Sequence, residues 1–286
     1  MASGTQSAAP HSSGHSAPAV VMLNGSCDCH MHLFDGRFPF AGPNALKHGD
    51  ASVADYQRLQ QRLGLERCVI VQPSGYGSDH RVLVSGLQAL GNAARGIAVV
   101  TPEVTADEVA TLSAQGVVGA RMNLVQRGVT DASMIEAIAG RIHPFGWHLQ
   151  VHLLPQDLIG LADRLVRLPV PVVVDHYARV HTDSTIAAEL RRALDRLMGT
   201  RRVWLKLSAP YIASPGPAPH SDLMPFVHEV LERFPDRLVW GSDWPHVTEA
   251  HKPDDAELVD ALSQWIGRID DRRRILVDNP RALYGF

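Results

Sequence analysis

Short apolar runs alternate with amphipathic segments along most of the chain. Eight runs are nearly continuously apolar and several are rich in valine; they lie at 26–34, 68–73, 96–102, 117–124, 148–154, 170–176, 203–210 and 238–245. Runs of this length and character are typical of parallel strands that are covered on both faces. We therefore predict eight parallel β-strands.

The segments between these runs have the period of amphipathic helices. They lie near 52–64, 79–92, 105–115, 131–145, 156–167, 184–199, 221–234 and 255–267, and several begin with a capping residue, namely Ser52, Ser78, Thr105, Thr130 or Ser221. Eight strand–helix alternations in a chain of 286 residues predict a single-domain (β/α)8 TIM barrel. A doubly wound open sheet is the alternative, but no GxGxxG turn follows the first run.

Other segments do not follow the alternating pattern. Residues 1–22 are rich in Ala, Ser, Gly and Pro, which predicts a disordered leader, and the barrel domain is expected over 23–286. The leader lacks the basic start and apolar centre of a secretion signal. The segments 36–49 and 212–220 are rich in Pro and Gly and are expected to be long loops over the mouth of the barrel.

The overall composition excludes several classes of partner. The formal net charge of −3 favours neither nucleic acid nor an anionic membrane surface, and no apolar stretch is long enough to cross a bilayer. The three cysteines Cys27, Cys29 and Cys68 lie in strand-like runs, which favours a reduced, cytoplasmic setting.

The motif CDCHMHLFD at 27–35 contains the most informative pattern in the chain. His30 and His32 are two residues apart on a predicted strand, so both imidazoles should point to the same face, and Asp28 should share that face. Two imidazoles that converge suit a metal ion or a carbonyl oxygen that becomes negative as it reacts. A pair of hydrogen-bonded core histidines is the alternative interpretation.

Three other predicted strands end in residues of the same kind. His152 lies near the end of the fifth run, His176 follows Asp175 at the end of the sixth, and Asp243 lies near the end of the eighth. In a (β/α)8 barrel all carboxyl ends of the strands meet at one mouth, where catalytic residues lie. The sequence therefore predicts one candidate mononuclear metal site, formed by His30, His32, His152, His176 and Asp243.

The fourth run ends beside two arginines. Arg121 lies inside the apolar strand and Arg127 follows it, and a guanidinium matches the geometry of a carboxylate. Because burying an unpaired guanidinium is costly, we expect a small anionic substrate there. Ser74, Tyr76 and Ser208 provide hydroxyls at the same rim. Lys206 could contact an anion or form a Schiff base, and His246 could move a proton or cap a loop.

Four motifs together resemble those of the amidohydrolase superfamily. They are DCHMHLFD near the start, VVVDH in the middle, WGSDWPH near the end and the closing DNPRALYGF, and the similarity covers residues 24–286. The match includes GARMNLVQRG and is most specific for the branch of 2-pyrone-4,6-dicarboxylate lactonases and 4-sulfomuconolactone hydrolases.

The resemblance implies a distorted (β/α)8 barrel that hydrolyses an anionic lactone in the degradation of aromatic compounds. By position, Asp243 would be the general base, His30, His32 and His176 would polarise the lactone carbonyl, and Arg121 and Arg127 would bind a substrate carboxylate. A monomer or homodimer is expected.

Two departures from the branch affect the substrate and the metal. The pyrone dicarboxylate lactonases have a tyrosine where this chain has His152, and a further arginine where it has Ile212. We therefore expect a different anionic lactone, such as a muconolactone or its 4-sulfo analogue, and one Zn²⁺. Catalysis without metal is the alternative for the cofactor. A sugar-acid lactonase or isomerase and a metal-dependent decarboxylase are the alternatives for the reaction.

Overall fold

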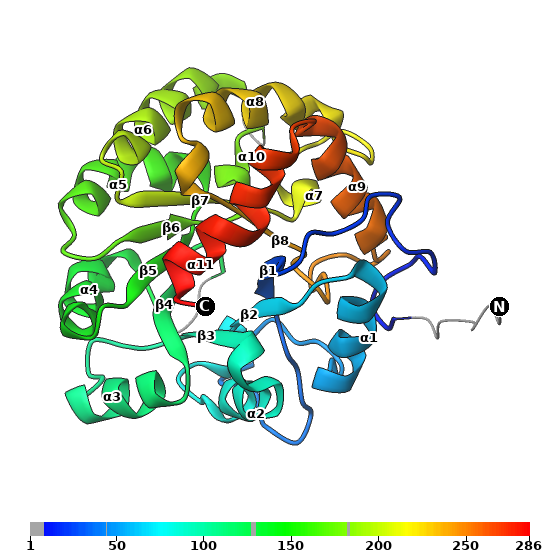
Figure 1. Cartoon of the computed structure of the whole chain (residues 1–286). Helices are drawn as coiled ribbons and strands as arrows, with labels where there is room; N and C mark the ends of the chain where they lie inside the picture. Colours follow the sequence, from blue (N-terminus) through cyan, green and yellow to red (C-terminus); the bar gives the residue numbers. More distant parts are fainter. Residues whose placement is uncertain (1–8, 44, 127–129, 182–183) are drawn as a thin grey trace.

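Eight strands form one sheet whose order follows the chain. The computed structural model describes residues 9–43, 45–126, 130–181 and 184–286 (Figure 1). The strands are β1 (Cys27–Met31), β2 (Arg67–Val71), β3 (Ala94–Ala98), β4 (Val117–Asn123), β5 (His148–His152), β6 (Val172–Val174), β7 (Val203–Ser208) and β8 (Leu238–Gly241). Each pairs in parallel with the next, which confirms the predicted strands.

The last strand returns to the first and closes the sheet. Met31 forms a parallel bridge with Trp244. Next to it, the backbone N–H of Asp243 donates to the oxygen of His30 at 2.7 Å, and that of His32 donates to the oxygen of Trp244 at 2.8 Å. The predicted (β/α)8 barrel is therefore confirmed.

Helices surround the barrel (Figure 1). They are α1 (Val53–Leu63), α2 (Arg81–Leu90), α3 (Ala106–Ala114), α4 (Ile135–Ile142), α5 (Pro155–Arg167), α6 (Ala187–Gly199), α7 (Pro210–Ala213), α8 (Met224–Arg233), α9 (Asp255–Trp265), α10 (Ile269–Arg273) and α11 (Asn279–Tyr284). Every predicted helix has a counterpart, whereas α7, α10 and α11 were not predicted.

Local capping explains where two of the helices begin. Ser52 and Asp55 form a reciprocal capping box at α1, and Thr105 and Glu108 form another at α3. Each box satisfies two backbone N–H groups that would otherwise lack a partner. The predicted caps at Ser52 and Thr105 are therefore confirmed, while α2 follows His80, whose side chain makes no capping bond.

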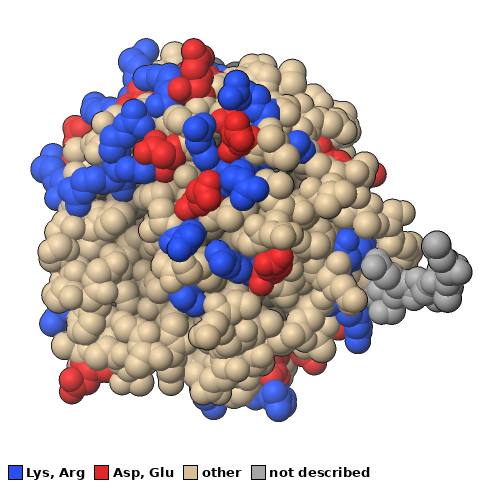
Figure 2. All heavy atoms as spheres, in the orientation of Figure 1, with Lys and Arg blue, Asp and Glu red and all other residues tan. Residues whose placement is uncertain are grey.

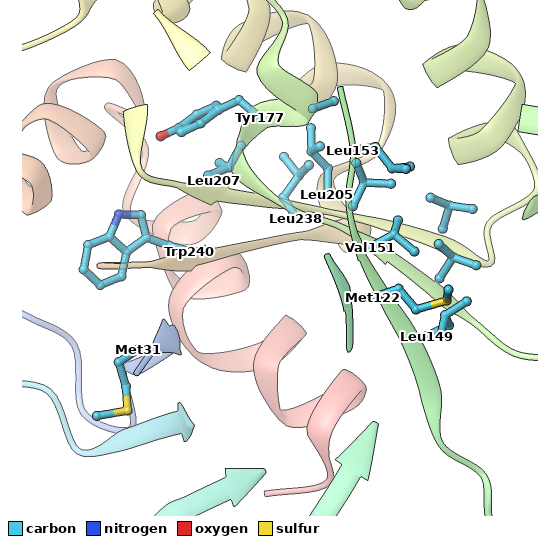
Figure 3. Packing of buried hydrophobic residues seen from close by; sticks show 14 of the residues in the cluster. Met31, Met122, Leu149, Val151, Leu153, Tyr177, Leu205, Leu207, Leu238 and Trp240 are labelled. Atoms are coloured by element: carbon cyan, nitrogen blue, oxygen red, sulfur yellow. The ribbon is translucent and has the colours of Figure 1, made fainter. Parts of the chain in front are cut away.

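Alternate residues of the strands face different surroundings. Leu149 and Val151 of β5 lie with Leu205 of β7 in the apolar cluster that packs beneath the helices (Figure 3). Gln150 and Lys206 occupy the intervening positions, and the Lys206 Nζ donates to Gln150 Oε1 at 2.8 Å. The side of the strands opposite the helices therefore holds a buried polar layer.

The C-terminal helix lies at the amino end of the barrel. In Figure 1 α11 crosses the centre of the view, and Tyr284 at its end is buried with its ring centroid 5.5 Å from that of His148. The Asn279 side chain holds the start of α11 by donating to the backbone oxygen of Leu238 at 2.7 Å. These contacts leave the carboxyl ends of the strands as the open end.

The amino-terminal segment differs from the predicted disordered leader. Residues 1–8 lie outside the described residues, but residues 9–22 contact the barrel. The Trp244 indole donates to the oxygen of Pro10 at 2.8 Å, and the Arg62 guanidinium donates to Ser12 Oγ at 2.7 Å and to the oxygen of Gly14. These hydrogen bonds to the buried residues Trp244 and Arg62 hold the segment against the barrel. Composition alone does not predict them.

Figure 2 shows charges of both signs interleaved mainly over the upper half of the face in view. Several charged residues form ion pairs between the outer helices. The pairs Arg164–Glu136, Arg196–Asp163, Arg233–Asp195 and Arg191–Glu229 connect neighbouring helices from α4 to α8. Exposed pairs of this kind each stabilise a fold by about 0–1 kcal/mol. Among the described residues, no helix combines the length and apolar character that crossing a membrane requires.

Candidate active site

Three imidazoles surround one carboxylate oxygen at the carboxyl ends of the strands. The Asp243 Oδ1 lies 3.5 Å from His30 Nε2, 3.6 Å from His32 Nε2 and 4.0 Å from His176 Nε2. His30 belongs to β1, His32 and His176 follow β1 and β6, and Asp243 follows β8. The predicted convergence of these four residues is therefore confirmed.

The other ring nitrogen of each histidine faces a group of the protein. His32 Nδ1 donates to the oxygen of Val71 at 2.7 Å, and His176 Nδ1 lies 2.9 Å from Ser208 Oγ. His30 Nδ1 lies 3.5 Å from Asp175 Oδ1. Because a carbonyl oxygen only accepts, the neutral form of His32 carries its proton on Nδ1 and has a lone pair on Nε2.

Burial keeps two of these imidazoles neutral. It lowers the pKa of His30 well below its ordinary value and also lowers the pKa of His176. Burial alone would raise the pKa of Asp243, but His176 and the other two imidazoles hold that pKa well below its usual range. Near pH 7 Asp243 is therefore a carboxylate, and His30 and His176 are in the deprotonated form that metal ligands require.

The cluster has the donor set and the spacing of a metal site. Ligand atoms of His30, His176 and Asp243 all lie within 4.8 Å of one another, and both nitrogens of His30 are buried without a hydrogen-bond partner in the described residues. Nitrogen and oxygen ligands around one Zn²⁺ are about 2 Å from the metal, which places them about 3.3 Å from each other. The observed separations fit one small divalent cation.

The second oxygen of Asp243 begins a buried chain of hydrogen bonds. Tyr211 donates its hydroxyl to Asp243 Oδ2 at 2.9 Å and lies 2.8 Å from His246 Nδ1. His246 Nε2 lies 3.1 Å from Oδ2 of Asp255, which is fully buried. The chain fixes the rotation of the Asp243 carboxylate and directs Oδ1 to the imidazoles.

Unusual backbone holds the cluster together. The residues His176–Arg179 form a left-handed turn with φ between 52° and 54°, although none is glycine. Non-glycine residues adopt this conformation at a cost of about 1–2 kcal/mol each, and such strain concentrates at functional sites. Gly241 allows β8 to lie close to β1, because a Cβ at this position would lie 2.6 Å from the backbone nitrogen of His30.

A cavity of about 340 Å³ opens above the cluster. Its lining includes His32, His176 and Asp243, and also Arg121, whose side chain is buried. Arg121 Nη1 donates to the oxygen of Gln72 at 3.2 Å, its Nε is unsatisfied, and no carboxylate of the described residues forms an ion pair with it. This guanidinium is therefore available to an anionic ligand.

Of the other predicted site residues, some line the cavity and some do not. Ser74 lines the cavity, and its buried hydroxyl has no hydrogen-bond partner in the part of the chain that the structure describes. His152 also lines the cavity, with Nε2 3.2 Å from Arg179 Nη1. Since a guanidinium donates to that nitrogen, His152 faces a cation and does not join the metal-ligand group formed by His30, His176 and Asp243. Arg127 lies outside the described residues.

Several predicted positions do not reach the cavity. Tyr76 does not line it, and its hydroxyl bonds to the backbone of Asp35. Ser208 contacts His176 and is fully buried. Lys206 is also fully buried, with Nζ 3.3 Å from Asp175 Oδ1, and it does not line the cavity where an anion or a carbonyl would bind. Asp28 does not share the face of His30, because the register shifts between Asp28 and Met31 and Asp28 accepts from Tyr56 of α1.

Two contributions were missed by the analysis of the sequence. Arg179 lines the cavity at the end of the left-handed turn, and the only sequence signal was a basic residue soon after the DH pair. Asp255 lies twelve residues beyond Asp243 and looked like an ordinary helix-start carboxylate. Its contact with His246 depends on the path of the loop, which the sequence pattern did not reveal.

Comparison with known proteins places the chain among related enzymes. Residues 27–286 match the family described as amidohydrolase. The chain is 36% identical over 283 residues to a 2-pyrone-4,6-dicarboxylate hydrolase of Comamonas testosteroni, covering 94% of this chain and 93% of the relative. It is 32% identical over 279 residues to a 4-sulfomuconolactone hydrolase of Rhizobium radiobacter, covering 94% and 93%.

A solved structure shows the same architecture. An apo structure from Agrobacterium tumefaciens superposes with a TM-score of 0.87 at 28% sequence identity, covering 94% of this chain and 98% of the other. The similarity therefore extends over the whole barrel.

Proposed function

The chain belongs to the amidohydrolase family, and from this premise we propose that it hydrolyses an anionic lactone with a water activated at Asp243. The observation that supports the proposal is the grouping of three imidazoles around Asp243 Oδ1 beneath a cavity that also contains the Arg121 guanidinium. The names of the relatives support a lactone from the degradation of aromatic compounds.

Arg121 is the proposed binding group for the anion of the substrate. Burial lowers the pKa of this guanidinium, because removing its charge from water costs free energy. A negatively charged ligand would offset that cost. The Ser74 hydroxyl provides a further donor in the same cavity. Arg127, His152 and Arg179 are the other proposed substrate contacts.

The residues present fit one divalent metal ion, and we propose Zn²⁺. His30, His32, His176 and Asp243 would hold it, because the Nε2 atoms of the three histidines lie 3.5, 3.6 and 4.0 Å from Asp243 Oδ1. When bound, such an ion polarises a carbonyl and lowers the pKa of water. The backbone of Val71 and the side chains of Asp175 and Ser208 keep the three rings oriented.

Asp243 performs the proton transfers. As a carboxylate near pH 7, it accepts a proton from water while the water oxygen adds to the lactone carbonyl carbon. The resulting tetrahedral intermediate collapses by breaking the bond from the carbonyl carbon to the ring oxygen. Asp243 then returns its proton to that ring oxygen, which becomes the hydroxyl of the opened product. Tyr211 holds the carboxylate in position throughout.

A screen of lactones tests the proposal. Each compound is incubated with the protein at constant pH, with and without added Zn²⁺, and the released acid is titrated. Aryl-derived and sugar-acid lactones are both included. Proton release from one group supports lactone hydrolysis and identifies the class. Release of carbon dioxide from an aromatic acid, with no lactone opened, would contradict it in favour of a decarboxylase.

Metal content tests the cofactor separately. Protein purified without chelator should contain about one equivalent of Zn²⁺ by elemental analysis, and the variant His30→Asn should contain much less. Full activity of a metal-free preparation in strong chelator would contradict the metal and leave the imidazoles as direct contacts of the substrate.

A further inference from the structure

The walls of the cavity differ in charge from one side of the barrel to the other. Arg121, His152 and Arg179 come from β4, β5 and the turn after β6. Phe34 and Glu249 come from the segments after β1 and β8. Because the strands follow one another around a closed barrel, β5 lies opposite β1. The two sets therefore face each other across the cavity.

The side formed by β4 to β6 is cationic. Arg121 is buried there without a carboxylate partner among the described residues, and Arg179 lies with its Nη1 3.2 Å from His152 Nε2. The lysines and arginines among the described lining residues are these two arginines alone. An anionic group of the substrate is therefore stabilised on this side.

The side formed by the segments after β7, β8 and β1 is apolar and acidic. Phe34, Leu46, Ile212 and Val247 provide apolar surface, and Glu249 provides a carboxylate whose Oε1 accepts from Thr248 at 3.0 Å. Lys252 interacts electrostatically with Glu249, but its Nζ donates to the oxygen of His246 at 2.7 Å and the residue does not line the cavity.

We infer that this site takes a lactone with a single anionic group, whose opposite end is uncharged and largely apolar. The inference rests on the proposed lactone hydrolysis and specifies its substrate. A second carboxylate at the opposite end would lose its hydration and lie near the like charge of Glu249. Among the described residues that line this side, no guanidinium would offset that cost. Like charges brought together in this way discriminate strongly between otherwise similar ligands.

A matched set of pyrones tests the inference. The compounds are 2-pyrone-6-carboxylate, its 4-methyl derivative and 2-pyrone-4,6-dicarboxylate, so the methyl group replaces the second carboxylate. We expect kcat/KM to be at least about tenfold higher for the two monocarboxylates than for the dicarboxylate. Equal or faster turnover of the dicarboxylate would overturn the inference while leaving lactone hydrolysis intact.

Charge changes at Glu249 localise the effect. The variant Glu249→Gln should raise the ratio of kcat/KM for the dicarboxylate to that for the monocarboxylates several-fold, and Glu249→Arg should raise this ratio further. Glu232→Gln and Glu232→Arg are matched controls at an exposed position of α8 and should leave the preference unchanged. A preference that does not respond to Glu249 would overturn the assignment of that residue.

Binding measurements distinguish a failure of the single-anion inference from a failure of the proposed lactone hydrolysis. If no pyrone is hydrolysed, calorimetric titration of the same three compounds into the protein still compares their affinities. Tighter binding of the monocarboxylates supports the single-anion site even if the reaction is a different one. Tighter binding of the dicarboxylate contradicts it.

Discussion

His30, His32 and His176 each present one ring nitrogen to Asp243 and the other to a group of the protein. For His32 the partner is a backbone oxygen, which only accepts, so the tautomer is fixed without any help from a ligand. A cluster arranged in this way offers lone pairs rather than N–H donors. It is therefore better suited to holding a cation than to donating hydrogen bonds to an oxyanion.

The first prediction at the residue scale concerns Asp243. The variant Asp243→Asn should lose at least about 1,000-fold in kcat, because an amide neither accepts the proton from water nor returns it to the ring oxygen. Steady-state kinetics and a thermal melt together check it. The exposed residue Asp270 provides the control Asp270→Asn, which should retain activity. Near-normal turnover by Asp243→Asn would remove its role as the base.

The second prediction concerns Tyr211. The variant Tyr211→Phe removes the hydrogen bond to Asp243 Oδ2 but keeps the ring, so the carboxylate should rotate more freely. We expect kcat to fall about tenfold with little change in KM, in keeping with the loss of one hydrogen bond to a charged group. A change in KM alone would instead indicate that Tyr211 contacts the substrate.

At the scale of elements, periodicity predicted the strands and most of the helices, because their apolar positions are set by burial against the barrel and so appear directly in the sequence. The left-handed turn at His176–Arg179 was not predictable, since none of its residues is glycine. Its conformation is stabilised by the surrounding fold and not by local preference. Arg179 was missed for this reason.

The strand β1 also has a feature that periodicity does not predict, the irregular register after Asp28. A period of two predicted that Asp28 and His30 share a face, and the histidines do converge on Asp243 as expected. The irregular register after Asp28 turns its carboxylate to Tyr56 and Ser242, where Oδ2 accepts at 3.0 Å and 2.6 Å. A bulge is set by pairing with β2, which a strand pattern does not contain.

The buried carboxyl of Asp28 gives a prediction for stability. Burial raises its pKa from the ordinary 3.8 to about 6. The folded state then binds a proton more tightly than the unfolded state. Ionisation of Asp28 therefore destabilises the fold as the pH rises from below 3.8 to above about 6, by about 3 kcal/mol in all. From pH 4 to pH 7, the free energy of unfolding of Asp28→Asn should therefore rise by about 2 kcal/mol relative to wild type, which is most of the full effect.

Urea unfolding at several pH values checks this prediction, and the difference between variant and wild type isolates Asp28 from other titrating groups. Asp28→Asn will have its own cost from altered hydrogen bonds with Ser242 and Tyr56, but that cost should not depend on pH. A difference that is the same at pH 4 and pH 7 would contradict the raised pKa.

At the scale of the whole molecule, the amino-terminal segment changes the expected limits of the fold. Composition alone places the leader outside the barrel, yet residues 9–22 bond to Trp244 and to Arg62, whose side chain is buried. Deleting residues 1–20 should lower Tm by several degrees, because the Arg62 guanidinium would lose its hydrogen bonds to Ser12 and Gly14 while its bond to Asp254 remains.

Scanning calorimetry measures this change. The variant Arg62→Met in the full chain is the matched comparison, because it removes the charge that the segment satisfies. If deletion of the segment left Tm unaltered, the contacts of residues 9–22 would contribute nothing to stability.

The closure of β8 on β1 has a consequence for how the site comes into being. The backbone N–H of Asp243 donates to the oxygen of His30 at the point where β8 closes on β1. The proposed base therefore follows the last strand, and its nearest imidazole belongs to the first strand. More than two hundred residues of chain separate them. No partly folded chain that lacks the last strand can assemble the site, and an ion held there would act as a clamp between the first strand and the last.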